Sequence, residues 1–385
     1  TFQLRNVPLE VRAPEGIEVE TLECSTGLSA VDLNLEAEET AAGLELRLTY
    51  LVDLFRPETA REMLEAYGWL LRSIAAAPGA RIGELRLMSA EREAEVACWK
   101  GEFRPIRKPM AYRILETAEA RGEKTAFVCG GRGATYAEYV ETARRTAALL
   151  RRAGVEPGSR VALIAKRSER LPAYLLGIWL AGCAVVPVDP ATPGRRVEFM
   201  LEDSGARLLL AERGCVDVRE CAMCGVELLD ELPEAAGAGA APVLDRSSAA
   251  CVIYTSGSTG QPKGAEIQHG AMTNVLEWLE RVIPMGPEDM VVNVASFAFD
   301  ACFADFYLAP AVGATVVIAG EEEARGGTPL AELLDRCGAT YMNVTPTAFT
   351  TLLESGWGGS KRLKALSGGE ALSPQLAAAL TGKVG

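Results

Sequence analysis

Between about residue 110 and residue 385, short apolar runs alternate with longer stretches that have helical spacing. Nine of these runs have the length and composition of strands buried on both faces. Buried strands spaced by helices are typical of a mostly parallel sheet flanked by helices. We therefore predict an α/β fold here, with strands at residues 125–129, 160–164, 184–188, 208–211, 249–254, 291–295, 315–318, 341–344 and 364–367.

The first 96 residues follow a different pattern. Leucines alternate with polar residues on either side of residues 39–43, which predicts a β-hairpin with one buried face. A helix with an apolar stripe is predicted to follow between Arg56 and Gly79. The pattern divides the chain into a partial α+β lobe at 1–96, a linker at 97–109 and the α/β core at 110–385.

Composition narrows the possible partners and location. The chain has 385 residues and a net charge of −13, which argues against binding of nucleic acid but permits a local nucleotide site. No secretory signal follows Thr1, so we expect a cytoplasmic protein. The uncharged run from Leu171 to Val188 contains prolines and glycines. It is better interpreted as a helix followed by a strand than as a membrane span.

Cys215, Cys221 and Cys224 are the one cysteine cluster that could suggest a metal. A zinc site needs a fourth ligand, and the single histidine, His269, is far away in sequence. We interpret the cluster as reduced thiols in a loop and assign no metal-ligating residues.

Residues 254–264 read YTSGSTGQPKG and follow an apolar run that predicts a buried strand. Glycines allow close approach of backbone to a ligand, and hydroxyls with a free amine can donate to an oxyanion. The segment differs from the usual P-loop, because Pro262 precedes Lys263 and Gly264 follows it. A surface turn rich in serine and glycine is the alternative. The full order favours a loop that binds a polyphosphate.

Asp300 lies in an almost wholly apolar segment, residues 298–306. A buried carboxylate is costly unless a cation or several donors meet it, and no lysine or arginine is near in sequence. The ammonium group of a substrate could satisfy it. Alternatively, Asp300 could cap a helix that begins at Ala301. The two interpretations are compatible.

These segments resemble the adenylate-forming enzymes, which include peptide synthetase adenylation domains, acyl-CoA synthetases and luciferases. Residues 254–264 resemble the phosphate-binding motif of that superfamily. Residues 134–139 (ATYAEY) and 180–189 (LAGCAVVPVD) resemble the first two adenylation-domain motifs. Residues 299–302 (FDAC) are similar to the Phe-Asp-x-Ser motif of amino-acid-activating members, with Cys302 in place of serine. The resemblance covers about 110–385 and implies the large N-terminal core of an adenylation domain.

Residues 1–96 resemble the C-terminal part of a peptide synthetase condensation domain. The similar segments read VDLNL at 31–35, LTYLVDLF at 48–55 and IGELRLM at 82–88. Condensation domains carry a paired-histidine motif, HHxxxDG, and this chain has a single histidine. We therefore expect that this lobe does not form peptide bonds by that route.

The resemblance implies ATP-dependent activation of an amino acid as an aminoacyl adenylate, with Mg²⁺ bridging phosphate oxygens. The implied catalytic residues are Lys263, Thr255 and Ser256. The implied ATP-binding residues are Thr255, Ser256, Gly257, Ser258, Thr259, Gly260 and Lys263, with Gly368, Gly369 and Glu370 beside the adenine. The implied substrate-binding residues are Asp300, Ala301, Ala304, Asn343, Leu366 and Gly368. Because three of the residues that line the side-chain pocket are very small, we expect a large substrate side chain.

The resemblance also implies partners. The aminoacyl group would be loaded onto the phosphopantetheine of a carrier domain, in the biosynthesis of a peptide such as an antibiotic. Adenylation domains carry a C-terminal subdomain with a catalytic lysine, and the corresponding segment is expected beyond Gly385. We expect the isolated chain to turn over slowly. The alternatives are an acyl-CoA or aryl-CoA synthetase of the same superfamily, or a fragment that only organises domains.

Overall fold

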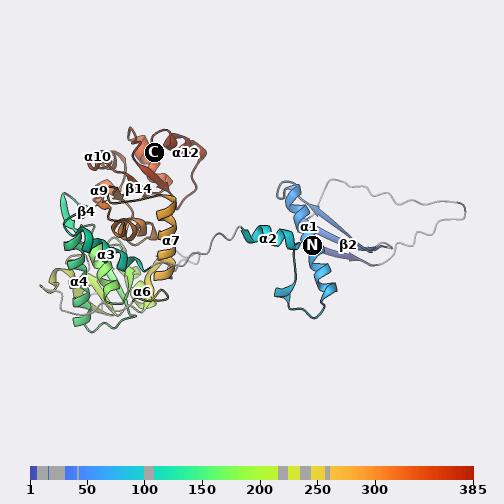
Figure 1. The fold of residues 1–385 in the computed structure, drawn as a ribbon, viewed down its shortest axis with the longest axis horizontal. Helices are drawn as coiled ribbons and strands as arrows, with labels where there is room; N and C mark the ends of the chain where they lie inside the picture. Colours follow the sequence, from blue (N-terminus) through green and yellow to red (C-terminus); the bar gives the residue numbers. More distant parts are fainter. Residues whose placement is uncertain are drawn as a thin grey trace. The chain divides into compact units, whose positions relative to one another are not determined.

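The structure is a computed structural model of the 385-residue chain, and it divides into two compact units, Thr1–Arg104 and Pro105–Gly385 (Figure 1). The described residues are 1–6, 16, 31–40, 43–98, 108–215, 224–234, 244–255 and 261–385. Most of the predicted linker, Cys221 and Ser256–Gly260 lie outside these ranges.

The first unit contains a three-stranded sheet in the order β1-β2-β3. Strand β1 (Phe2–Arg5) pairs parallel to β2 (Leu33–Thr40), which pairs antiparallel to β3 (Gly43–Tyr50). The β2–β3 register runs from Leu33 opposite Tyr50 to Thr40 opposite Gly43, so the predicted hairpin is confirmed.

One 20-residue helix, α1 (Pro57–Ala76), packs against β3 in this unit. It begins with proline at its first position, where the missing N–H costs no hydrogen bond. This confirms the predicted helix. A 3₁₀ turn, η1 (Ile82–Glu84), and a short helix, α2 (Ala90–Cys98), complete the described part of the unit.

The second unit is built on two six-stranded sheets. The first has the order β11-β10-β7-β6-β8-β9, in which β11 pairs antiparallel to β10 and the other pairs are parallel. Its strands are β6 (Arg160–Ile164), β7 (Ala184–Pro187), β8 (Leu208–Ala211), β9 (Gly225–Leu228), β10 (Ala249–Thr255) and β11 (Lys263–Gln268).

The second sheet has the order β15-β14-β12-β13-β4-β5, with only the β4–β5 edge pair antiparallel. Its strands are β4 (Thr125–Cys129), β5 (Arg132–Thr135), β12 (Met290–Asn293), β13 (Thr315–Ile318), β14 (Tyr341–Val344) and β15 (Lys364–Ser367). The predicted mostly parallel α/β architecture is therefore confirmed for this unit.

Helices cover both sheets. They are α3 (Met110–Arg121), α4 (Tyr136–Arg152), α5 (Leu171–Leu180), α6 (Gly194–Ser204), α7 (His269–Val282), α8 (Ala309–Ala311), α9 (Glu321–Ala324), α10 (Gly327–Cys337), α11 (Pro346–Glu354) and α12 (Pro374–Thr381). Short turns η2 (Leu229–Glu231), η3 (Asp300–Cys302) and η4 (Ala304–Leu308) connect elements.

Helix α5 is buried along its whole length, and it crosses α4 at Gly177. A Cβ atom there would lie 2.5 Å from the Cβ of Thr146 and 2.6 Å from the carbonyl oxygen of Ala143. The close packing of α4 and α5 therefore requires glycine at this position. Together with α3, these helices enclose the largest hydrophobic core, in which Trp179 and Tyr136 are fully buried.

All nine predicted strands are present, with ends shifted by two residues at most. Strands β5, β9 and β11 were not predicted. Each is the last strand at a sheet edge and is partly exposed, so it lacks a continuous apolar run. Among the described residues, no helix has both the length and the apolarity needed to cross a membrane.

Candidate functional site

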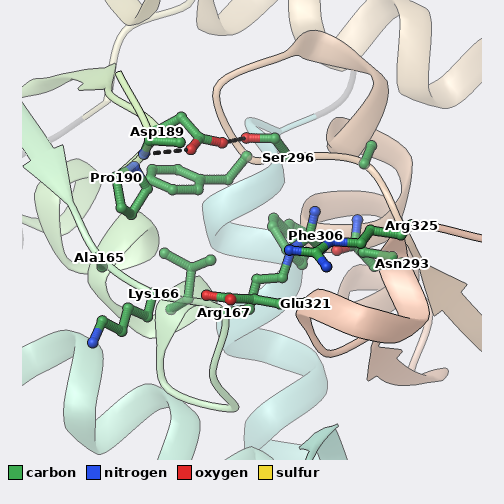
Figure 2. Close-up of a pocket in the computed structure, with 15 residues that line it drawn as sticks. Ala165, Lys166, Arg167, Asp189, Pro190, Asn293, Ser296, Phe306, Glu321 and Arg325 are labelled. Carbon is green, nitrogen blue, oxygen red and sulfur yellow. Dashed lines mark hydrogen bonds between the residues drawn. The ribbon is translucent and has the colours of Figure 1, made fainter. Parts of the chain in front are cut away.

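The carboxyl ends of strands from both sheets surround a cavity of about 320 Å³ in the second unit (Figure 2). Residues that follow β6, β7, β12 and β13 line it. In open parallel sheets, ligands bind outside the carboxyl ends of the strands. The lining includes Lys166, Arg167, Asp189, Asn293, Ser296, Phe306, Glu321 and Arg325.

Two hydrogen bonds join the ends of the two sheets beside this cavity. Ser296 Oγ donates to Asp189 Oδ2 at 2.6 Å, the contact drawn at the top of Figure 2. Arg167 Nη2 donates to the carbonyl oxygen of Val294 at 2.7 Å. Burial lowers the pKa of Arg167, and the carboxylate of Asp189 opposes that effect. The two sheets are thus joined directly at the site.

A second hollow of about 260 Å³ lies beside the first. Tyr254, from the end of β10, and Phe299, which precedes Asp300, both line it. The Tyr254 hydroxyl donates to Asp203 Oδ2 at 2.6 Å, which fixes the ring. Burial and the contact with Asp203 raise the pKa of this tyrosine. The hollow therefore joins the predicted phosphate loop to the segment that carries Asp300.

The predicted phosphate loop begins and ends on paired strands. Thr255 ends β10, Lys263 begins β11, and the two residues face each other in the antiparallel ladder. Both residues are exposed, so their side chains can meet a ligand from solvent. A Cβ at Gly264 would lie 3.0 Å from the Tyr254 ring, which favours glycine there. The intervening Ser256–Gly260 lie outside the described residues.

Asp300 does not have the environment that the sequence predicts. It is the first residue of η3 and is exposed, so the expectation of a buried carboxylate is wrong. Phe299 occupies the N-cap and makes no side-chain capping bond, so the capping interpretation is also wrong in its predicted form. The turn places Asp300 outward and buries Cys302 instead. An exposed carboxylate can accept a cation from solvent.

Three of the predicted substrate residues meet beside β14. Asn343 pairs with Leu366 of β15, and its Nδ2 donates to the carbonyl oxygen of Ala301 at 3.2 Å. Ala304 is buried at the start of η4, a five-residue π-helical turn. The backbone N–H of Gly368 donates to Val344 at 3.4 Å. These positions come from four separate elements, η3, η4, β14 and β15 with the turn that follows it, yet they lie at one end of the second sheet.

The Gly368–Glu370 turn follows β15. Gly369 has φ +83°, in the left-handed region that favours glycine. The Glu370 carboxylate accepts from Thr347 Oγ1 at 2.5 Å and from the Thr347 N–H at 3.3 Å. The turn is therefore held against the start of α11, and its glycine backbone is open to solvent.

Sequence reasoning did not single out Arg167 or the Asn293–Asp305 pair. Asp305 is fully buried, and burial raises its pKa to about 7. It lies in the same apolar stretch as Asp300, so the argument applied to Asp300 could have found it. The described residues contain no group of three His, Cys, Asp or Glu side chains that could hold a metal.

Comparisons with known proteins agree on one family. The family model described as AMP-binding enzyme matches residues 114–385. Bacitracin synthase 3 of Bacillus licheniformis is 30% identical over 384 residues, which are 98% of this chain and 6% of that protein. Surfactin synthase subunit 1 of Bacillus subtilis (strain 168) is 32% identical over 331 residues, 83% of this chain and 9% of that protein. The chain thus spans less than a tenth of either relative.

Two solved structures are also similar. The nonribosomal peptide synthetase FmoA3, in its form with α-methyl-L-serine-AMP bound, has a TM-score of 0.77 at 25% identity, covering 99% of this chain and 44% of that one. The four-domain synthetase holo-AB3403, bound to AMP and glycine, has a TM-score of 0.68 at 27% identity, covering 92% of this chain and 27% of that one.

Proposed function

The chain belongs to the AMP-binding enzyme family, and we propose that it activates an amino acid with ATP to form an aminoacyl adenylate. One observation carries this proposal. Tyr254, at the start of the phosphate loop, and Phe299, beside the exposed Asp300, line the same hollow. A nucleotide phosphate held by the loop would therefore lie next to a ligand held by Asp300. The complexes of FmoA3 and AB3403 support the choice of an amino acid.

In the proposed reaction, a carboxylate oxygen of the amino acid attacks the α-phosphorus of ATP. A new O–P bond forms, the bond to the bridging oxygen breaks, and pyrophosphate leaves. Charge on the phosphate oxygens is met by positioned donors and cations. Thr255 and Lys263 fit this role because both are exposed where the loop joins β10 and β11. Ser256, Ser258 and Thr259 would add hydroxyl donors. Mg²⁺ would enter bound to ATP and neutralise phosphate charge.

Asp300 would orient the substrate by accepting from its ammonium group. Its exposure supports this role, because the carboxylate is reachable from solvent before the substrate arrives. Ala301, Ala304, Asn343, Leu366 and Gly368 would surround the substrate side chain. The contact of Asn343 with Ala301 and its pairing with Leu366 support a shared pocket wall. Gly368–Glu370 would pass beside the adenine ring.

The product would be transferred to the phosphopantetheine of a carrier domain. Similarity to bacitracin and surfactin synthases, across most of this chain, supports a place on a peptide assembly line. Residues 1–96 would then be the end of a condensation domain. The described part of this unit, a hairpin with a helix packed on β3, is compatible with that assignment.

The test is ATP–pyrophosphate exchange across a panel of amino acids, with fatty and aryl acids as controls. It is run with this chain and with a longer synthetase that joins it to a C-terminal subdomain. Exchange that depends on one or a few amino acids would support the proposal. Exchange driven only by fatty or aryl acids would instead assign an acyl-CoA synthetase. No exchange with any acid in the longer protein would contradict both assignments.

A further inference from the structure

Asp305 places a carboxyl group in the apolar interior of the second unit. It lies in η4 directly after Ala304 and is fully buried, as are Phe306 and Leu308 of the same turn. A buried carboxylate is costly unless a cation or several donors meet it. The hydrogen bond found for Asp305 comes from Asn293, whose Nδ2 donates to Oδ2 at 2.8 Å.

Asn293 is equally buried, at the end of β12. Its Nδ2 is used by Asp305, which leaves its amide oxygen, Oδ1, without a hydrogen-bond partner among the described residues. Asp305 Oδ1 also has no hydrogen-bond partner among the described residues. An ionised carboxylate and an amide oxygen are both acceptors, so neither can satisfy the other. An unsatisfied buried polar atom destabilises the fold, and here two belong to one contacting pair.

We propose that Asp305 is protonated in the folded protein and forms a neutral carboxylic acid–amide pair with Asn293. The proton lies on Asp305 Oδ1 and is donated to Asn293 Oδ1, while Asn293 Nδ2 donates to Asp305 Oδ2. One proton thus satisfies both acceptors and removes the buried charge. A cyclic pair with two parallel hydrogen bonds also fixes the relative orientation of η4 and β12.

The electrostatic surroundings agree with this state. Burial raises the pKa of Asp305 to about 7, and the hydrogen bond from Asn293 opposes that shift. The titratable groups that sense its charge are the Cys302 thiol and the Tyr341 hydroxyl. Burial raises the pKa of both, so both are neutral. No cation among the described residues contributes to the Asp305 shift, and Arg167 is coupled to Asp189 and Glu321 instead.

The pair would serve the substrate site, an inference that rests on the proposed function. The segment from Asp300 to Ala304 carries the proposed ammonium ligand and part of the pocket. Asp305 ties the end of that segment to β12, which pairs with β14, the strand of Asn343. Asp305 is therefore a positioning residue: it holds Asp300 and Ala304 opposite Asn343 without touching the substrate.

The protonated pair is tested by infrared spectroscopy on the 385-residue chain at about pH 6, where ordinary carboxylates are ionised. We expect a carbonyl stretch from a protonated carboxylic acid. Asp305→Asn should remove it while keeping two hydrogen bonds, because an amide–amide pair has the same donors and acceptors. The exchanged double variant, Asn293→Asp with Asp305→Asn, should restore the band.

Glu212→Gln is the matched control, because burial also raises the pKa of Glu212. If the Asp305 band is assigned correctly, this variant keeps it. Absence of any band from the wild-type chain, or a band that survives Asp305→Asn and vanishes in Glu212→Gln, would overturn the proposal.

The positioning role is tested in exchange assays with the longer synthetase. Above the pKa, the fraction with a protonated Asp305 falls tenfold for each pH unit, so the KM for the amino acid should rise by about the same factor. The KM for ATP should change less. Asp305→Asn should abolish the rise in amino-acid KM, because its pair does not titrate.

The two proposals can fail separately. If no amino acid drives exchange, the proposed function fails, while the infrared band still decides the state of Asp305. If amino acids do drive exchange but the variant keeps the wild-type pH profile, the positioning role is wrong and the proposed function stands.

Discussion

Asp300 and Asp305 lie five residues apart in one apolar stretch, yet their surroundings are opposite. Asp300 opens a 3₁₀ turn and is exposed beside Phe299, which is itself 57% exposed. Asp305 sits in the following π-helical turn and is fully buried against β12. Apolar neighbours in sequence therefore do not set the exposure of a carboxylate. Its exposure depends on its position within the turn that carries it.

The difference in burial between Asp300 and Asp305 also gives the carboxyl group two different uses. An exposed carboxylate costs little to keep ionised and is available to a cationic ligand. A buried carboxyl group is stable when it is protonated and paired. Predictions that affect one aspartate and spare the other test this division.

The largest expected effect is on the pH dependence of stability. The Asp305 pKa of about 7 lies above the ordinary value of 3.8, so the folded state binds this proton more tightly than the unfolded state. The resulting stabilisation is complete below about pH 4 and is lost as pH rises to about 7, for a total of roughly 4 kcal/mol.

This stabilisation is measured as the difference in urea unfolding free energy between the wild type and Asp305→Asn from about pH 4 to pH 8. The difference should shrink steadily as pH rises. A difference that does not change with pH would mean that Asp305 is ionised throughout, contrary to the prediction.

The second effect is on activity. Asp300→Ala removes the proposed partner of the substrate ammonium group. The ion pair between them would become buried only when the substrate binds. Loss of one partner from such a pair should lower kcat/KM for the amino acid roughly 100-fold in pyrophosphate exchange. Asp305→Asn, measured at about pH 6, is the matched control and should stay within roughly threefold of wild type. Unchanged exchange in Asp300→Ala would remove Asp300 from the site.

The third effect is on stability, where a substitution at Asp305 should matter more than one at Asp300. Asp305→Ala leaves the Asn293 amide buried without its partner and opens a small void, so it should cost roughly 2–3 kcal/mol. Asp300→Ala changes an exposed side chain and should stay within roughly 0.5 kcal/mol. Urea unfolding of both variants at one pH gives the comparison. Equal losses would show that the difference in burial has no energetic consequence.

The smallest effect concerns Cys302, which lies between the two aspartates and is buried. Cys302→Ser restores the residue of the similar family motif but places a hydroxyl where the thiol makes a long contact of 3.8 Å with the Phe297 carbonyl oxygen. We expect a loss of about 1 kcal/mol and nearly unchanged exchange. A large loss of exchange would instead indicate that the thiol contacts the reacting groups.

The sequence was sufficient for the interior of the second unit. Strands such as β6 and β13 are buried on both faces, so each appears as a continuous apolar run that specifies a strand by itself. The edge strands β5, β9 and β11 do not. Strand β11 reads KGAEIQ and is recognisable only through its pairing with β10. A strand that is held by pairing rather than by burial leaves little trace in a local hydrophobic pattern.

The candidate site was also predictable only as far as local sequence patterns reach. The residue types at Thr255, Lys263 and Asp300 indicated the chemistry, and the family resemblance added Asn343. The structure brings Asn343 to Ala301 and Thr255 opposite Lys263. The burial of Asp300 was predicted wrongly, because a 3₁₀ turn followed by a π-helical turn shifts the helical phase. No local pattern in the sequence predicts that shift.

The bonds from Ser296 to Asp189 and from Arg167 to Val294 have a mechanical consequence. The two hydrogen bonds link the two sheets at the end where ligands would bind. Sliding one sheet over the other would have to break both hydrogen bonds. The distance between the two walls of the site is therefore set when the unit folds, and a ligand need not spend binding energy to bring them together.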